Sequence, residues 1–314
     1  MSGGGTLTFG DPDGYAAGFG DVRLSLTITG AGDFKARLTR LKLQHLEIYR
    51  CYESLPRICY ILLPPGPIVV SFPLSKAPSI LDGSVFRNGD IVLHDRGGRF
   101  HQRSPGDCQW GLISLSATQL ARSGETLTGR QIVLSPQASR IMQPSGADAT
   151  RFRSLYKDAC DLAETGNKLI ERREVARALE HDLLYAIIHC LTEYGADDKS
   201  KTKRHHAAVM ARFEEVLSRR IDQKLTMPEL CAEVGVPERT LRMCCAEFLG
   251  VSPMRYILLR RLNKARSALR RADPSTASVA EVARNHQFLE LGRFAVTYRA
   301  IFGESPSATL HRSP

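Results

Sequence analysis

The sequence lacks the segments that mark exported and membrane-spanning proteins. Residues 1–7 carry no basic group and no apolar core of signal-peptide length. No stretch approaches about 18 uninterrupted apolar residues, since even residues 58–72 are broken by three prolines. We therefore expect a soluble cytoplasmic protein without a membrane partner.

Disulfide and metal signatures are also missing. The eight cysteines show no CxxC spacing, and two of them, Cys244 and Cys245, are adjacent, so buried free thiols in a reducing compartment are expected. There is no HxH motif, and His94 and His101 stand seven residues apart, so we expect no metal and no other cofactor. An enzyme would need clustered His/Glu ligands or an activated nucleophile, and the sequence shows neither.

The 314 residues are long enough for about two domains, and their charge is unevenly distributed. Residues 1–150 carry a net charge of +3 and residues 151–198 carry −3, so these two parts cancel. Residues 199–314 hold 21 Lys and Arg against 11 Asp and Glu, which accounts for the whole +10. A surplus confined to one domain is typical of a protein that binds a polyanion, with nucleic acid as the first candidate.

Short β-like runs with turn signals between them extend from residue 22 to about residue 134. The clearest runs are residues 22–28, 58–63, 68–72, 91–93 and 110–115. Many short strands without intervening helices predict a β-barrel or sandwich over residues 1–150.

The pattern changes to helical spacing over residues 151–164 and 171–194. The second stripe consists of Val175, Leu179, Leu183, Ile187 and Leu191. Such a stripe either packs against its own domain or pairs with a second subunit, so residues 151–195 are expected to be a packing segment, with homodimerisation through 171–194 as the other use. The polar residues 196–206, including His205 and His206, predict a linker with solvated histidines.

The last hundred residues contain an internal repeat. Thr226-Met-Pro-Glu229 has the pattern of a helix-capping box, and Ser278-Val-Ala-Glu281 repeats it 52 residues later. Downstream, residues 249–253 align with residues 302–306 at an offset of 53. The change of one residue implies a turn one residue longer in the second copy.

Each copy predicts a helix, a tight turn and a second helix. In the first copy Gly235 can take the left-handed turn conformation at little cost. Gln287 stands at that position in the second copy, where a left-handed backbone would cost about 1 kcal/mol. Between the copies, Ser252-Pro253 begins a long helix with one apolar face and one basic face, the latter carrying Arg260, Lys264, Arg270 and Arg271.

Two matched copies joined by a basic amphipathic helix predict an all-α DNA-binding domain over residues 207–314 with two helix-turn-helix motifs. A helical bundle with a solvated basic face is the alternative.

These residues resemble the AraC/XylS family of bacterial transcription regulators, over about residues 207–312. Three stretches carry the resemblance: Leu230-Cys-Ala-Glu-Val-Gly-Val-Pro-Glu-Arg-Thr-Leu241, Gly250-Val-Ser-Pro-Met-Arg-Tyr-Ile257, and residues 282–306 with Gly292-Arg-Phe294 and Phe302-Gly-Glu-Ser-Pro306. The resemblance implies an α+β protein, with a cupin-like β-barrel or sandwich and helices at the N-terminal side and the all-α domain after it. It implies double-stranded DNA, a small-molecule effector and RNA polymerase as partners, and its C-terminal part is similar to the branch that includes regulators responding to aromatic acids.

The resemblance further implies that the second helix of each motif enters a major groove, with the two about one DNA turn apart. Arginine can offer a planar fork to guanine, glutamate can accept from cytosine, and Val296 either touches a thymine methyl or packs inside. The base-contacting candidates are Glu238, Arg239, Thr240, Arg242, Met243, Arg293, Val296 and Thr297. The phosphate-contacting candidates are Arg255, Arg260, Lys264, Arg266 and Arg299. The family often has Arg at the position of Met243, and Arg261 falls on the family's Arg-Leu motif, where a structural role is expected.

Basic residues are frequent between Arg23 and Arg57, where acidic ones are few. They are either solvated strand edges or a site for an anionic effector, a carboxylate or a nucleotide phosphate. The effector-binding candidates are Lys35, Arg37, Arg40, Lys42 and Arg50.

Together these patterns indicate a ligand-responsive, sequence-specific DNA-binding transcription regulator, of the activator type that recruits RNA polymerase, and no enzyme. Two alternatives remain at this point. The first is an effector-independent DNA-binding protein, and the second is a cupin-type enzyme with an accessory helical domain.

Overall fold

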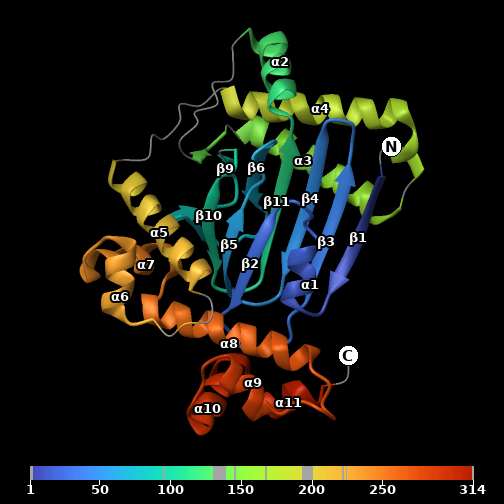
Figure 1. The fold of residues 1–314 in the computed structure, drawn as a ribbon. Helices are drawn as coiled ribbons and strands as arrows, with labels where there is room; N and C mark the ends of the chain where they lie inside the picture. The colour runs from blue at the N-terminus through green and yellow to red at the C-terminus, as the bar shows by residue number, and fades with distance from the viewer. Residues whose placement is uncertain are drawn as a thin grey trace.

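Two antiparallel β-sheets face each other in the N-terminal half of the chain, and helices follow them (Figure 1). The computed structural model describes residues 3–94, 96–129, 139–144, 146–166, 168–192, 201–220, 223 and 225–312. The first sheet has the strand order β1 (Gly3–Phe9), β3 (Ala36–Lys42), β4 (Leu46–Glu53), β11 (Cys108–Leu115), β6 (Ile68–Pro73), β9 (Ile91–His94), β12 (Arg140–Met142). The second has the order β2 (Arg23–Ile28), β5 (Arg57–Leu62), β10 (Arg99–Ser104), β7 (Ser79–Leu81), β8 (Ser84–Phe86). The predicted β-sandwich and its five clearest strands are confirmed.

The period of two along each strand divides its side chains between two cores. On β4, Leu46 and Ile48 pack under the helices that cover the larger sheet, whereas Tyr49 and Cys51 point between the sheets. Strand β6 is buried along its whole length because it is covered on both faces.

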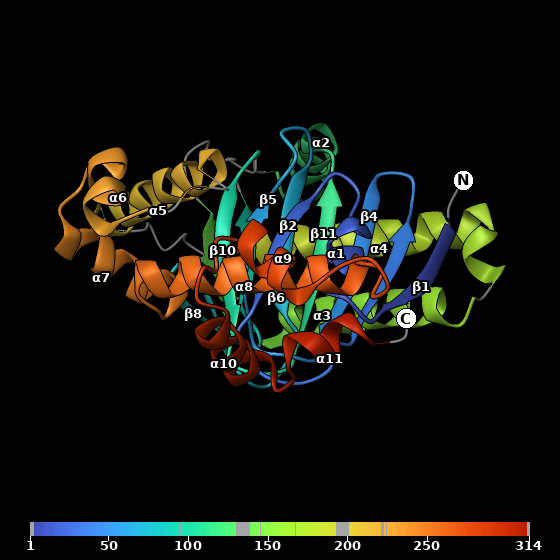
Figure 2. The ribbon, with the colours of Figure 1, turned by 60° about the horizontal axis from the view of Figure 1, so that its bottom comes forward.

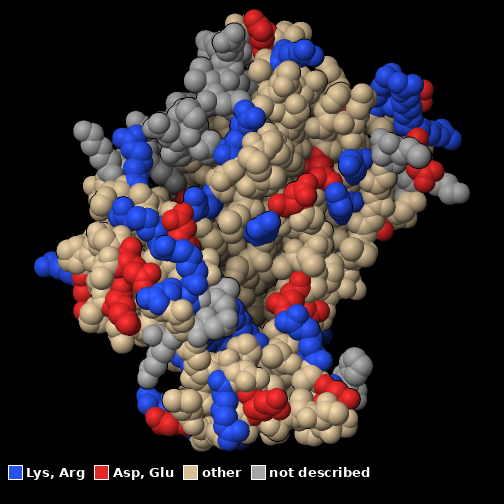
Figure 3. Space-filling model, in the orientation of Figure 1, with Lys and Arg blue, Asp and Glu red and all other residues tan. Residues whose placement is uncertain are grey.

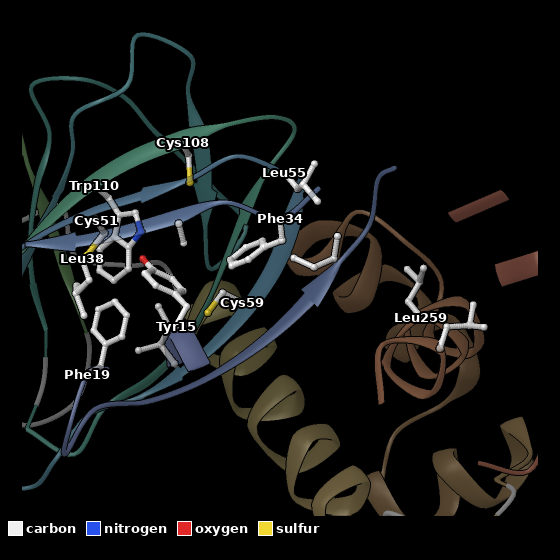
Figure 4. Packing of buried hydrophobic residues seen from close by; sticks show 14 of the residues in the cluster. Tyr15, Phe19, Phe34, Leu38, Cys51, Leu55, Cys59, Cys108, Trp110 and Leu259 are labelled. Carbon is white, nitrogen blue, oxygen red and sulfur yellow. The ribbon is translucent and has the colours of Figure 1, made fainter. Parts of the chain in front are cut away.

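The space between the sheets is filled by the short helix α1 (Pro12–Ala17) and the residues after it. Tyr15 and Phe19 insert between the strands beside Trp110, and the rings of Phe19 and Trp110 stack with centroids 5.7 Å apart (Figure 4). The Tyr15 hydroxyl donates to Glu53 at 2.9 Å, and Arg57 pairs with the same carboxylate, all of it buried. Burial opposes the negative charge of Glu53, but the charge of Arg57 outweighs it and lowers the pKa of the carboxyl.

Helices interrupt the N-terminal region where only strands were predicted. Besides α1, helix α2 (Ala117–Thr128) lies within it, and α3 begins five residues before residue 151. Leu120 of α2 is fully buried in the core under the helices. It anchors one side of an otherwise polar helix to this core, which accounts for a helix at this point of the chain.

Helices α3 (Gly146–Glu164) and α4 (Arg173–Thr192), with the 3-10 turn η1 (Lys168–Glu171) between them, cover the larger sheet. The predicted stripe of α4 packs here, since Leu183, Ile187 and Leu191 are buried in this core. No large apolar side chain of α4 is exposed over Arg173–Thr192. These three residues of the stripe therefore pack within their own domain, and homodimerisation through 171–194 stays a prediction.

The C-terminal part is all helical, with α5 (Lys201–Arg219), α6 (Met227–Val234), α7 (Glu238–Leu249), α8 (Pro253–Arg271), α9 (Val279–Asn285), α10 (Leu291–Phe302) and α11 (Pro306–Leu310). The predicted linker 196–206 is therefore wrong for residues 201–206, which begin α5; residues 196–200 lie outside the described residues. His206 is buried and hydrogen-bonded to Glu247 of α7 at 2.7 Å instead of being solvated. This contact holds the first turns of α5 against α7.

Helix α8 lies between the sheets and the last three helices in Figure 1, and in Figure 2 it runs across the strands. Its buried residues Leu259, Leu262 and Leu269 share one continuous core with the interior of the β-sandwich. The helices of the described ranges are all too short or too polar to span a lipid bilayer. All eight cysteines are free thiols, seven of them buried, as predicted.

Candidate nucleic-acid interface

The first helix-turn-helix motif consists of α6 and α7 around Gly235. Glu229 reaches back and accepts from the Thr226 backbone amide at 2.8 Å, which closes the start of α6. Gly235 ends α6 with φ +74°, a left-handed backbone that only glycine adopts without strain. The turn thus brings the two helices together as the repeat predicts.

Helix α7 is amphipathic, and its inner face sets which residues point outward. Leu241, Cys244, Cys245, Phe248 and Leu249 are buried. The predicted base-contacting residues on the other side are exposed, namely Glu238, Arg239, Arg242 and Met243, while Thr240 is half-buried. Arg242 and Glu238 form an ion pair at 2.6 Å with both side chains about half exposed. This pair orients the Arg242 guanidinium on the outer face, beside Arg239.

The second motif consists of α9 and α10 around Gln287. Ser278 accepts from the Glu281 backbone amide at 3.1 Å, and Gln287 is left-handed with φ +63°, the strained conformation that the repeat predicts. Arg261 of α8 stabilises this turn by donating to the backbone carbonyls of His286 and Gln287 and by stacking over Phe288, 4.6 Å from its centroid. These contacts account for the structural role expected of Arg261.

The outer face of α10 differs from that of α7. Arg293 and Arg299 are exposed, and Val296 is 71% exposed, so this valine does not pack inside. The Thr297 hydroxyl donates back to the Arg293 carbonyl at 2.8 Å and is turned toward its own helix. The side of this motif that faces solvent is therefore more apolar than that of the first motif.

The phosphate candidates on α8 divide into two groups. Arg255 is exposed at the beginning of the helix and Lys264 is half-buried. Arg266 is buried, pairs with Glu304 at 2.7 Å and packs over Phe302, and Arg260 pairs with buried Glu214. The phosphate assignment is thus wrong for Arg260 and Arg266, because both guanidinium groups are held inside the protein by carboxylates.

The basic face of α8 is turned toward the β-sandwich. Asn263 pairs with the backbone of Ile28 on β2 in both directions, with its amide donating and its carbonyl accepting at 3.0 Å each. Arg270 donates to the Gly10 carbonyl at 3.1 Å, and Arg271 pairs with Asp13 of α1 at 3.0 Å. This face joins two parts of the chain, which helical periodicity alone could not show.

A second junction centres on Glu214 of α5. Its buried carboxylate accepts from His101 of β10 at 2.9 Å and from Tyr256 of α8 at 2.8 Å, and it pairs with Arg260. Burial alone would raise the pKa of Glu214, but the hydrogen bond from His101 and the charge of Arg260 outweigh it and lower the pKa to about 2. One carboxylate therefore links the β-sandwich, α5 and α8.

Sequence reasoning missed this junction. Its members come from three distant segments, and the single signal was an acidic residue on the apolar side of α5, where Val209, Met210, Phe213 and Val216 are buried.

The effector candidates do not form one cluster. Lys35 and Arg37 line a hollow of about 530 Å³ together with Phe9, Tyr52 and Gln109. Lys42 lines a separate hollow of about 360 Å³ at the other end of β3. Arg40 pairs with Glu47, and Arg50 pairs with Asp161 and Glu164 of α3, which fixes that helix on the sheet. Of the five, Lys35 and Arg37 are the two brought together.

Neither His94 nor His101 belongs to a cluster of metal-ligating side chains among the described residues. His94 bonds to Ser71 at 2.7 Å and stacks on Phe100, and His101 faces Glu214. Within the described ranges, no three His, Cys, Asp or Glu side chains converge as metal ligands would.

Charged side chains of both signs cover α5 to α7, whereas the view of Figure 3 shows larger uncharged areas over the sheets. The count of charged residues in the sequence places the excess of positive charge in residues 199–314.

Comparison with known proteins concerns the same helices. Residues 230–312 match the family model described as a helix-turn-helix domain. The probable thc operon regulatory protein of Rhodococcus erythropolis is 40% identical over 100 residues, which is 32% of this chain and 30% of that protein. The XylDLEGF operon transcriptional activator 2 of Pseudomonas putida is 33% identical over 99 residues, 32% of this chain and 63% of that protein. The chain thus spans less than two thirds of the length of either relative.

A crystal structure of a probable AraC family transcriptional regulator from Rhodopseudomonas palustris is 32% identical. The match covers 33% of this chain and 95% of that chain, with a TM-score of 0.30.

Proposed function

The chain belongs to the AraC/XylS family of transcriptional regulators, and on this premise we propose that it binds specific DNA sequences through both helix-turn-helix motifs. The observation that supports this most directly is the duplicated motif, with Arg239 and Arg242 on the outer face of α7 and Arg293 on the outer face of α10. Each recognition helix enters one of two adjacent major grooves, about one DNA turn apart.

In this proposal the residues of α7 read polar base edges. Arg239 and Arg242 donate to guanine O6 and N7, and Glu238, which already orients Arg242, accepts from cytosine. Thr240 and Met243 lie beside these residues on α7 and contact neighbouring bases. On the second motif Arg293, Val296 and Thr297 face the groove.

The phosphate contacts fall to Arg255 and Arg299, whose side chains are exposed. Lys264, between the motifs, stays a phosphate candidate from the sequence.

We further propose that the β-sandwich binds a small anionic effector, a carboxylate or a nucleotide phosphate, in the hollow that Lys35 and Arg37 line. Its volume of about 530 Å³ suits a small ligand, and Tyr52 and Gln109 add polar groups beside the two cations. The bound state reaches the DNA-binding helices through the contacts of α8 with the β-sandwich, at Asn263 and at Glu214.

The direction of regulation is proposed from a relative. The Pseudomonas putida protein is named as a transcriptional activator, and we propose that this chain also activates transcription, by recruiting RNA polymerase. An effector-independent DNA-binding protein is the second candidate, and the contacts between the β-sandwich and α8 favour the regulated form. Membership in a family of regulators sets the enzyme alternative aside.

The two parts of the proposal are tested separately. Selection of binding sites from random DNA with the full chain should enrich one sequence. Arg239→Ala should weaken binding to that sequence more than it weakens binding to random DNA. For the effector, thermal unfolding is followed with a panel of carboxylates and nucleotides. A ligand at about 100 times its Kd should stabilise the protein by about 2.7 kcal/mol.

Lys35→Ala and Arg37→Ala should abolish that stabilisation, whereas Lys42→Ala, in the separate hollow, should keep it. Stabilisation that survives both substitutions would place the effector elsewhere, and transcription that is the same with and without the β-sandwich would favour the effector-independent candidate.

A further inference from the structure

The second helix-turn-helix motif exposes two large apolar side chains. Leu289 is 81% exposed and Val296 is 71% exposed, the two highest values among the exposed large apolar side chains of the described residues. Neither belongs to a hydrophobic cluster, although their neighbours Phe288 and Leu291 pack against the core. Folding therefore gives no reason for these two side chains to be large and apolar.

The two residues lie on the side of the motif that is turned outward. The opposite side of α10 is buried through Phe294, Tyr298 and Phe302. Val296 and Arg293 are three residues apart and share the exposed face, and Leu289 lies just before the helix begins. In Figure 1, α10 lies below α8, on the side of that helix away from the sheets, so the β-sandwich leaves this face uncovered.

Polar groups able to read a base are scarce on this face. The Thr297 hydroxyl is bonded to the Arg293 carbonyl, and Gly292 has no side chain and has open space where a Cβ would lie. Arg293 is the exposed charged group in the first turn of α10. A helix with this face cannot select a sequence mainly by hydrogen bonds, in contrast to α7 with Glu238 and Arg242.

One base presents an apolar group in the major groove, because thymine carries a C5-methyl there. We propose that Leu289 and Val296 recognise thymine C5-methyl groups, so that the second motif selects a thymine-containing half-site by apolar contact. This inference rests on the proposed function and adds to it the base that the second motif reads.

The charge of α10 favours DNA over a protein as the occupant of this apolar face. Its sequence, Leu291–Phe302, contains two arginines and no acidic residue, and the carboxylate beside its first turn is the exposed N-cap residue Glu290. Arg293 in the first turn can reach a base edge and Arg299 can hold a flanking phosphate, while the bare backbone at Gly292 lets the helix approach the groove closely. An activator surface on RNA polymerase is the other occupant, and the experiment distinguishes it.

The test replaces single thymines of the selected operator by deoxyuridine, which removes only the methyl group. The half-site of each motif is first identified with Arg239→Ala and Arg293→Ala. Removing a buried methyl should weaken binding of the full-length protein about fourfold at one or two positions in the second half-site. Each of Leu289→Ala and Val296→Ala removes the side chain that contacts one of these methyl groups. Each variant should therefore bind the thymine and deoxyuridine operators equally when the exchange is made at the base that its lost side chain contacts.

The matched control is Val85→Ala, which shortens an exposed valine on β8 and should leave the fourfold discrimination intact. Because Leu289 and Val296 are exposed, their variants should unfold at the temperature of the wild type. Equal binding of thymine and deoxyuridine operators by the wild type at every position of the second half-site would overturn the proposal.

Variants that keep the discrimination but lose transcription activation would also overturn it and assign the face to a protein partner. If selection enriches no sequence at all, the proposed DNA-reading function fails first, and that result is distinct from an enriched operator without methyl dependence.

Discussion

Replacing Gln287 by glycine should stabilise the second helix-turn-helix motif. A left-handed backbone costs a non-glycine residue about 1–2 kcal/mol, and Gln287 has φ +63°. Its side-chain oxygen is also buried without a hydrogen-bond partner among the described residues, which costs about another 1 kcal/mol or more. Glycine removes both costs but has more freedom in the unfolded chain, which takes back about 0.5–1 kcal/mol. The expected net gain is at least about 1 kcal/mol.

The first motif supplies a control in the opposite direction. Gly235 holds the corresponding turn with φ +74°, and a Cβ at this position would meet no atom within 4 Å. Gly235→Gln should therefore destabilise the first motif by about 1 kcal/mol through its backbone conformation alone. The two substitutions exchange the residues of the two turns.

Hydrogen exchange of the full-length protein measures both effects locally. Backbone amides of α9 and α10 should exchange about fivefold more slowly in Gln287→Gly, and those of α6 and α7 about fivefold faster in Gly235→Gln. Unchanged or faster exchange in the first variant, together with unchanged exchange in the second, would refute the claim that the left-handed backbone of the turn limits the stability of these motifs.

Three further predictions concern the junctions and the reading face. The pKa of folded Glu214 is lowered to about 2, so the stabilisation that this carboxylate gives is complete above about pH 4.5 and is lost as the pH falls toward 2. In Glu214→Gln the free energy of unfolding should therefore depend less on pH over this range, and an unchanged dependence would contradict the junction. Arg261→Ala should speed hydrogen exchange around Gln287 while exchange in α6 stays as in the wild type, because its guanidinium bonds to the turn carbonyls of the second motif. Arg242→Ala should cost about 1–3 kcal/mol on the operator in a binding titration, and an equal loss on random DNA would reassign it to a phosphate.

The helical repeat could be predicted because its signals are local. A capping box, a glycine in the left-handed turn and the spacing of buried residues such as Leu230 and Leu241 all act within about 15 residues of one another. Aligning the two copies also places Gln287 at the position of Gly235, which predicts the strained left-handed turn in the second motif. The outward faces of α7 and α10 then follow from which residues the core buries.

The contacts between domains could not be predicted in this way. The basic face of α8 has the same pattern whether it meets solvent, DNA or protein, so Arg260 and Arg266 were assigned to phosphates although Glu214 and Glu304 hold them. Those partners lie 46 and 38 residues away in the chain. Leu289 was missed for a related reason, since a lone apolar residue beside buried Phe288 and Leu291 resembles a core position.

The most direct test of the central claim is a footprint of the full-length protein on the operator that it selects. Two motifs that read adjacent major grooves should protect two half-sites about 10 base pairs apart. Arg239→Ala should relax the sequence preference in one half-site and Arg293→Ala in the other. A single protected half-site, or one in which both substitutions relax the same bases, would contradict the account of two reading helices.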